Sequence, residues 1–391
     1  MADARIAPLD LIDLEALLTD EERLGRDTVR RFVDDRVRPH VARWYVDGRL
    51  PVRDLARELG DLGVLGMHLE GYGCAGTSAT AYGRACLELE AGDSGLRSLV
   101  SVQGSLAMFA LHRHGSEEQR QEWLPRLARG EAIGCFGLTE PDSGSDPAGM
   151  RTTARRDGGD WVLSGSKAWI TNGEVADVAI VWARTDDGVR GFVVPTDAAG
   201  FSAGPVAEKL SLRASVTSRL DLDDVRLPDA AALPGATGLG AALACLNEAR
   251  FGIVFGVVGA ARDCLETAVD YAVLREQFGR PLAGFQLTQR KVAGMTVEVC
   301  RAMLLALHLG RRKDAGALRP AQVSLGKLAN ARAALDVARE ARTVLGANGI
   351  SVEYPVMRHA ANLESVLTYE GTEEVHTLVV GEAVTGISAY R

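Results

Sequence analysis

The chain has 391 residues, of which 47% are hydrophobic and 25% charged, and its net charge is −8. This length and balance are typical of a soluble globular protein with two or three domains. The acidic charge, without a basic block, argues against a nucleic-acid-binding protein. No apolar run approaches the ~20 residues that cross a bilayer, and the N-terminus resembles neither a signal nor a transit peptide. We therefore expect a cytoplasmic protein without membrane insertion.

The cysteines and histidines argue against a disulfide-linked protein and against a metal-binding protein. The six cysteines are dispersed without a CxxC pair, which favours reduced thiols over a disulfide framework. The seven histidines show no metal-ligand spacing, so we predict no metal.

Residues 1–132 are predicted to form an α-helical domain. Thr19–Glu22 and Ser116–Gln119 have the capping-box pattern that opens a helix. Pro39 is expected to kink or split the first helix. The spacing of apolar residues predicts further helices over 54–62, 77–90 and 94–112.

The helix expected over 94–112 carries a polar stripe. Its members recur at steps of three and four and are Arg97, Ser98, Ser101 and Ser105. Such a stripe is usually a solvent-facing surface. Serine is a weak helix former, however, and a buried stripe of one arginine and small hydroxyls would suit a small carboxylate.

Residues 133–238 are predicted to form a β-sandwich or barrel, because short β-prone runs alternate with turn signals. We expect strands over 161–163, 167–171, 178–183, 191–194 and 220–225. The Pro- and Gly-rich segment 233–238 is expected to be a linker. Residues 239–391 are again helical in pattern, and long segments over 239–274, 285–314, 321–345 and 360–384 predict a four-helix bundle.

Glu370 occupies a short junction inside the last of these segments. The pattern before Leu367 is helical, and Thr372 can cap a new helix with Glu373 and Glu374 in its first turn. A carboxylate placed between two helices can project into a cleft. On the local pattern alone, a solvated acid is the simpler interpretation.

Two further segments could bind a polar cofactor. The loop 136–146 is dense in Gly, Pro, Ser and Thr, and it offers backbone N–H groups and hydroxyls to a phosphate or a polar heterocycle. The strand 167–171 then presents Trp169 and Thr171, which could stack on a planar group and donate a hydrogen bond. Trp169 could equally be a core residue.

The order and spacing of these blocks resemble the acyl-CoA dehydrogenase family along essentially the whole chain. The segments Asp93–Ser98 with Ser101, Asn348–Ile350 and Thr368–Thr372 are most similar to its glutaryl-CoA branch. The resemblance implies an N-terminal helical domain, a middle β-domain and a C-terminal four-helix bundle. It also implies a homotetramer that uses FAD and passes electrons to electron-transferring flavoprotein.

Site residues carried over from the family fall into three groups. The resemblance implies Glu370 as the catalytic base, since the alternative family position aligns with Ala249. It implies acyl-CoA contacts at Arg97, Ser98, Ser101, Ser145, Leu243, Asn247, Arg250, Gly371 and Tyr390. It implies FAD contacts at Phe136, Leu138, Thr139, Ser145, Trp169, Ile170, Thr171, Arg275, Phe278, Gln286, Thr343, Leu345, Gly346, Ala347 and Thr372. The adenine half would be held partly by a neighbouring subunit, and Ala347 replaces a glycine that is usual in the family.

The expected reaction is α,β-dehydrogenation of glutaryl-CoA, with decarboxylation to crotonyl-CoA and CO₂. Arg97 would bind the distal carboxylate, because a buried carboxylate without a partner costs several kcal/mol. The alternatives are a related enzyme for another short-chain or dicarboxylyl-CoA, one that stops at glutaconyl-CoA, and a non-catalytic flavin- or acyl-CoA-binding scaffold.

Overall fold

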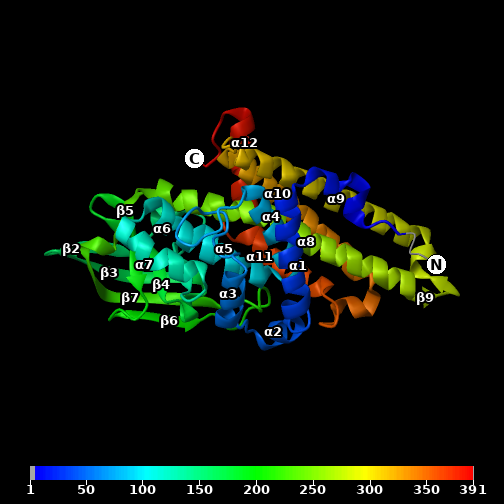
Figure 1. The fold of residues 1–391 in the computed structure, drawn as a ribbon, viewed down its shortest axis with the longest axis horizontal. Helices are drawn as coiled ribbons and strands as arrows, with labels where there is room; N and C mark the ends of the chain where they lie inside the picture. The colour runs from blue at the N-terminus through cyan, green and yellow to red at the C-terminus, as the bar shows by residue number, and fades with distance from the viewer. Residues whose placement is uncertain (1–4, 391) are drawn as a thin grey trace.

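The computed structural model describes residues 5–390 as an elongated molecule in three parts (Figure 1). Helices occupy the N-terminal part and the C-terminal part, and a β-sheet lies at one end between them in sequence. The N-terminal helices are α1 (Asp20–Phe32), α2 (Val41–Asp47), α3 (Val52–Asp61), α4 (Ala79–Gly92), α5 (Ser94–Ser101), α6 (Phe109–His114) and α7 (Glu117–Ala128).

The predicted helix signals of this part are confirmed. Thr19 and Ser116 each form a complete capping box, with Glu22 and Gln119 respectively. A π-helical segment, η3 (Val33–Val37), follows α1, and a break around Pro39 separates it from α2. Proline lacks the N–H that would continue the helix, so the chain turns there.

The helix with the polar stripe differs from a regular α-helix. It begins at Ser94, where the Asp93 carboxylate accepts a hydrogen bond from the Gly95 N–H at 2.7 Å. A π-helix, η4 (Val102–Met108), then joins α5 to α6. The stripe is buried rather than solvent-facing, so the carboxylate-binding alternative survives. Single π-helical turns are often found at functional sites.

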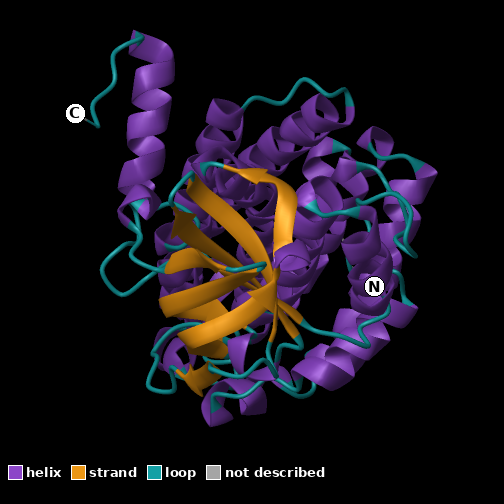
Figure 2. Cartoon of the chain, turned by 90° about the vertical axis from the view of Figure 1, so that its left-hand side faces the viewer, coloured by secondary structure: helices purple, strands orange, loops and turns teal. Residues whose placement is uncertain are grey.

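The middle part is one hydrogen-bonded sheet of eight strands (Figure 2). Its order is β6-β7-β3-β2-β4-β5-β8, with β1 also paired to β4. The pairs β1–β4 and β2–β4 are parallel and the others antiparallel. The strands are β1 (Gly134–Gly137), β2 (Thr153–Asp157), β3 (Asp160–Thr171), β4 (Val178–Thr185), β5 (Gly188–Pro195), β6 (Phe201–Pro205), β7 (Thr217–Pro228) and β8 (Ala232–Thr237).

The prediction of a linker over 233–238 is wrong, because most of this segment forms β8. Arg190 and Phe192 of β5 pair with Thr237 and Ala232, and a register shift separates the two pairs. Proline and glycine are tolerated here because β8 is an edge strand, where one side of the backbone needs no ladder partner.

The C-terminal part contains α8 (Leu239–Leu274), α9 (Gln286–Asp314), α10 (Pro320–Val344), α11 (Val356–Thr368) and α12 (Glu373–Thr385). The three long helices confirm the predicted segments to within one residue at each end. The fourth segment is divided into α11 and α12 at Glu370. Where a helix end was expected near Arg275, a small hairpin of β9 (Glu276–Gln277) and β10 (Arg280–Pro281) follows α8.

One core joins the two helical parts. Apolar residues of α1, α3 and α4 form a single buried cluster with residues of α8, α9 and α10. By length and composition, α8 and α9 each contain a stretch apolar enough to cross a bilayer, contrary to the expectation that no segment would. Because 72% of that stretch of α8 is buried, its apolar character belongs to the protein core.

Candidate active site

Glu370 lies between two helices, as predicted. Helix α11 ends at Thr368, and α12 begins at Glu373 with the Thr372 hydroxyl accepting a hydrogen bond from the Val375 N–H. Glu370 itself has a φ of 53°, in the left-handed region that a glutamate rarely adopts. Strained backbone of this kind clusters at functional sites.

Cationic side chains hold the backbone on both sides of this residue. Arg250 Nε of α8 donates to the Glu370 carbonyl oxygen at 2.7 Å. Lys327 Nζ of α10 donates to the Gly371 carbonyl oxygen at 2.6 Å and also to that of Tyr369. Three consecutive carbonyl oxygens are therefore bound to residues of the bundle, and the turn is fixed from two helices.

The Glu370 carboxylate is in an environment that makes it a stronger base than an exposed glutamate. Its Oε2 atom is buried and has no hydrogen-bond partner among residues 5–390. Burial raises the pKa of this carboxyl, while the positive charges of Arg97, Lys327 and Arg250 oppose the rise. A partly buried carboxylate with a raised pKa and a free oxygen can accept a proton from a bound substrate.

Arg97 lies beside this base and is fully buried. Its Nε donates to Glu90 Oε2 at 2.7 Å, and its Nη2 donates to the Tyr369 hydroxyl. Its Nη1 is buried without a partner in the described part of the chain. Burial lowers the pKa of Arg97, but Tyr369, Glu90 and Glu370 more than compensate, so it stays charged. A charged, unpartnered N–H group can bind a substrate carboxylate.

The serines of the stripe differ in whether their hydroxyl groups already have a hydrogen-bond partner. Ser101 Oγ is buried and has no partner in residues 5–390, whereas Ser105 Oγ is 2.7 Å from the Tyr82 hydroxyl. Ser98 is also buried. Ser101 is thus available to a ligand, while Ser105 already has a protein partner.

The residues predicted to hold the flavin half of FAD lie together in the sheet domain. Phe136 and Leu138 are buried at the end of β1 and just after it, and the Thr139 carbonyl oxygen accepts from the Ala168 N–H at 2.9 Å. Trp169 is 63% exposed on β3 with a φ of 61°, so it is not the core residue of the simpler interpretation. Ile170 is buried, Thr171 is partly buried and Ser145 is exposed.

A buried ion pair supports this loop. Lys167 Nζ of β3 donates to Glu140 Oε1 at 2.8 Å, and the same carboxylate accepts from the backbone N–H groups of Arg151 and Thr152. An exposed indole in a strained conformation beside a braced loop fits a planar cofactor such as a flavin.

The residues predicted to contact the adenine half lie at the opposite end of the molecule. They lie at or just after the C-terminal ends of α8 and α10 and at the start of α9, and are Arg275, Phe278, Gln286, Thr343, Leu345, Gly346 and Ala347. The sheet domain and β9 lie at opposite ends of the chain (Figure 1). One chain therefore does not bring the two groups of predicted FAD residues together.

The predicted acyl-CoA contacts on α8 are placed near the base. Arg250 Nη1 donates to Asn247 Oδ1 at 3.0 Å, and Leu243 is exposed one turn away. Gly371 has a φ of 95°, and a side chain there would collide with His376. Tyr390 donates its hydroxyl to the Val375 carbonyl oxygen at 3.0 Å, on the outer side of α12.

Sequence reasoning missed four residues of this site. Glu90, Lys327 and His376 are buried polar groups on helices, and Tyr369 contacts Arg97. Lys327 could have been noticed, because it lies on the same helix face as Val323, Ser324 and Ala331, where a lysine is unusual. Tyr369 lies inside the segment Thr368–Thr372 that resembles the family, whereas Glu90 and His376 carried no local signal.

Three models of one family match this chain. The acyl-CoA dehydrogenase N-terminal, middle and C-terminal domain models match residues 19–131, 135–225 and 236–385, respectively. The short-chain specific acyl-CoA dehydrogenase of Bos taurus is 36% identical over 371 residues, which are 93% of this chain and 90% of the relative.

Solved structures of similar proteins agree with this assignment. Glutaryl-CoA dehydrogenase from Mycobacterium smegmatis is 70% identical with a TM-score of 0.98, over 99% of this chain and 100% of that chain. A glutaryl-CoA dehydrogenase from the same organism in complex with FADH2 is 64% identical with a TM-score of 0.98, over the same shares of both chains. The chain belongs to the acyl-CoA dehydrogenase family and is an oxidoreductase that dehydrogenates acyl-CoA thioesters.

Proposed function

We propose that this enzyme oxidises glutaryl-CoA and decarboxylates it to crotonyl-CoA and CO₂. The proposal depends on Arg97, which is buried and charged and whose Nη1 has no partner within residues 5–390. Arg97 also contacts Tyr369, the residue next to Glu370. A pocket for a simple fatty-acyl chain would gain nothing from such a group, because the charge of Arg97 is already paired with Glu90 and a buried N–H group without a partner is costly. A distal carboxylate would pair with it.

Glu370 removes the α-proton of the thioester. That proton is only weakly acidic, so the reaction needs a base whose pKa is raised by burial, as at Glu370. Arg97 and Ser101 hold the far end of the acyl group and orient it relative to this base. Hydrogen bonds from Arg250 and Lys327 to the backbone fix the position of the carboxylate.

FAD is the cofactor that we propose, and when bound it supplies the acceptor for the hydride from the β-carbon. The exposed Trp169 and the loop braced by the Lys167–Glu140 pair would hold its flavin half. The presence of FADH2 in the similar structure from Mycobacterium smegmatis supports this choice.

Decarboxylation follows from the same residues. After oxidation, the bond to the distal carboxylate breaks and CO₂ leaves, while the electron pair is delocalised into the unsaturated thioester. Glu370, which holds the abstracted proton, returns it to the carbanion and forms crotonyl-CoA. No additional oxidant is consumed in this step.

We further propose that the active enzyme is a homotetramer in which each FAD is shared between subunits. The position of the two groups of FAD residues at opposite ends of the chain supports this, because one chain does not bring both groups together. Helix α12 extends away from the body of the chain (Figure 2), and Val384 and Ile387 on and after it are strongly exposed. Electron-transferring flavoprotein is the proposed acceptor, as the family implies.

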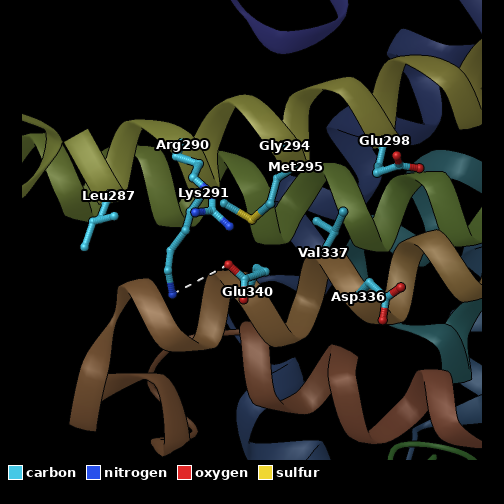
Figure 3. A pocket seen from close by; sticks show the side chains of 9 residues that line it. All are labelled: Leu287, Arg290, Lys291, Gly294, Met295, Glu298, Asp336, Val337 and Glu340. Carbon is cyan, nitrogen blue, oxygen red and sulfur yellow. Dashed lines mark ion pairs between the residues drawn. The ribbon is translucent and has the colours of Figure 1, made fainter. Parts of the chain in front are cut away.

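The surface between α9 and α10 is also suited to subunit contact. It forms a cleft of about 450 Å³ lined on one side by Leu287, Gly294 and Met295 and on the other by Val337 (Figure 3). Lys291 and Glu340 form an ion pair across it at 3.6 Å. Exposed apolar side chains along α9, such as Val297 and Leu304, continue this face, which is typical of a helix that packs against another copy.

The test is turnover of the purified flavoprotein with glutaryl-CoA and with butyryl-CoA, using a dye as acceptor. Release of crotonyl-CoA and CO₂ in equal amounts from glutaryl-CoA is expected. Oxidation of glutaryl-CoA without CO₂ would indicate a non-decarboxylating enzyme. Oxidation of butyryl-CoA alone would keep the family and refute the glutaryl assignment.

Glu370→Gln tests the base. The variant is expected to keep bound FAD and to bind CoA esters, but to lose reduction of the flavin by either substrate. Undiminished reduction would refute the role of Glu370.

A further inference from the structure

We propose that Lys327 is a positioning residue for the base: its hydrogen bonds to the carbonyl oxygens of Tyr369 and Gly371 hold the turn that presents Glu370, and its ammonium group acts on that carboxylate without bonding to it. The inference rests on the proposed role of Glu370. Lys327 belongs to α10 and contacts the junction between α11 and α12.

The geometry of the turn requires such support. Glu370 has a φ of 53°, and such backbone at a residue other than glycine persists only where the surroundings determine it, whereas Gly371 adopts its φ of 95° without steric cost. Lys327 bonds to the carbonyl oxygens on either side of Glu370, at Tyr369 and at Gly371. A rotation of either flanking peptide would break one of these bonds, so a single ammonium group limits the orientation of the Glu370 side chain.

Lys327 differs from the other fully buried lysine. Lys167 donates directly to the carboxylate of Glu140 at 2.8 Å, and this pair braces a loop. The hydrogen bonds of Lys327 go to backbone oxygens instead, and within residues 5–390 Oε2 of Glu370 has no partner. The cation therefore stabilises the ionised carboxylate from nearby without occupying the oxygen that must accept the proton.

The charges around Lys327 come from several elements. Glu370 faces it from the junction, Arg250 from α8 and Arg97 from α5. His376 of α12 also feels its charge. Burial is the main cause that lowers the pKa of Lys327 to about 7; Glu370 opposes this shift, and the two arginines add to it. Burial lowers the pKa of His376 to about 3, so this imidazole is neutral.

Removal of the Lys327 charge should raise the pKa of Glu370. Burial raises the pKa of Glu370, and Arg97, Lys327 and Arg250 limit the rise. Lys327, with a pKa of about 7, is charged on the acid side of this value. In that range its removal raises the pKa of Glu370 further, so a smaller fraction of the enzyme holds an ionised base at a given pH. The acid limb of the pH–rate profile should then move to higher pH.

The experiment compares four variants of the full-length flavoprotein: Lys327→Met, Lys327→Gln, Lys209→Met and Glu370→Gln. Lys327→Met removes both donors and charge, whereas Lys327→Gln keeps amide donors without the charge. Lys209→Met is the control, because Lys209 Nζ also donates to a carbonyl oxygen, that of Ser215 at 2.9 Å, but on the segment between β6 and β7. Flavin content, CoA-ester binding and single-turnover flavin reduction by glutaryl-CoA and butyryl-CoA are measured from about pH 5.5 to 9.

Lys327→Met is expected to keep FAD and ester binding while reducing its flavin on the order of 100-fold more slowly with both esters. Its acid limb should lie at higher pH than that of the wild type. Lys327→Gln should recover part of the rate but keep the displaced limb. Lys209→Met should match the wild type in rate and in pH profile.

A wild-type rate and pH profile in Lys327→Met would overturn the proposal. A loss confined to ester binding, or an equal loss in Lys209→Met, would also overturn it. If Lys327→Met does not fold, the pH profile of Lys327→Gln decides in the same way. If Glu370→Gln still reduces the flavin, the proposed role of Glu370 as the base is wrong, and the proposed function fails. If Glu370→Gln is inactive while Lys327→Met behaves like the wild type, only the proposed role of Lys327 is wrong.

Discussion

Arg97 and Glu90 form an ion pair in which both side chains are fully buried, with 2.7 Å between Nε and Oε2. The pair lies against α8 at Gly256, where a Cβ atom would be 2.1 Å from Glu90 Oε2 and 3.2 Å from Arg97 Nε. Glycine at this position thus allows an arginine to lie beside the proposed base. Breaking such a pair leaves an uncompensated buried charge, which makes the arrangement sensitive to single substitutions.

Arg97→Met should lower the turnover of glutaryl-CoA much more than that of butyryl-CoA. Methionine retains most of the volume but cannot bind a distal carboxylate, so we expect kcat/KM for glutaryl-CoA to fall about 30- to 150-fold, the effect of losing a charged hydrogen bond of about 2–3 kcal/mol. The value for butyryl-CoA should fall much less. Steady-state kinetics with both esters check this, and equal losses would contradict a carboxylate-binding role.

Gly256→Ala should have a similar but weaker effect. The added methyl group displaces the Glu90–Arg97 pair, so glutaryl-CoA turnover should fall more than butyryl-CoA turnover. Gly240→Ala is the matched control, because Gly240 is in the same helix with no atom within 4 Å of its Cβ position. Loss of activity in the control and not in Gly256→Ala would contradict the argument.

Glu140 should make the protein sensitive to acid. Burial raises the pKa of this carboxyl, but hydrogen bonds from the Arg151 N–H, Lys167 and Thr152 outweigh it and lower the pKa from 4.5 to about 2. The resulting stability is present above pH 4.5 and is lost as the pH falls from about 4.5 towards 2. Urea unfolding at several pH values should show this loss, and Glu140→Gln should be less stable at pH 7 with a flatter dependence below pH 4.5.

Arg262→Met should destabilise the contact between α4 and α8. Arg262 donates twice to Glu88, at 2.8 and 2.7 Å, and both side chains are buried. We expect a loss of about 3 kcal/mol in the free energy of unfolding, since Glu88 then keeps its bonds to Arg30 and a longer ion pair with Arg84 at 4.0 Å. Arg36→Met, which breaks the exposed pair with Glu58, should have little effect. Comparable losses in the two variants would contradict the prediction.

Phe278→Ser should lower FAD retention although the residue is far from Glu370. Phe278 is 95% exposed beyond the end of α8, as expected of a side chain that contacts a neighbouring subunit or its cofactor. Leu274→Ser, another strongly exposed residue at the same end, is the control. Flavin content after gel filtration measures the effect, and equal retention in the two variants would argue against a shared adenine site.

Local patterns in the sequence determined most of the fold. Helical periodicity predicted α8, α9 and α10 closely, and the capping pattern at Thr19 predicted the start of α1, because these signals depend on neighbours within one or two turns. Periodicity missed β8 and the π-helix η4, where pairing with β5 and packing against residues such as Gly66 override local preference.

The position of Glu370 between two helices, and the motif around it, were visible in the sequence alone. Only the tertiary structure decided that the serine stripe is buried, that Arg97 keeps an unpartnered N–H group, and that Lys327 binds the backbone beside Glu370. The reason is physical: burial and charge pairing depend on side chains from α4, α5, α8 and α10 that are distant in sequence. A linear pattern shows which groups a chain carries, and packing sets their solvation, their partners and hence their chemistry.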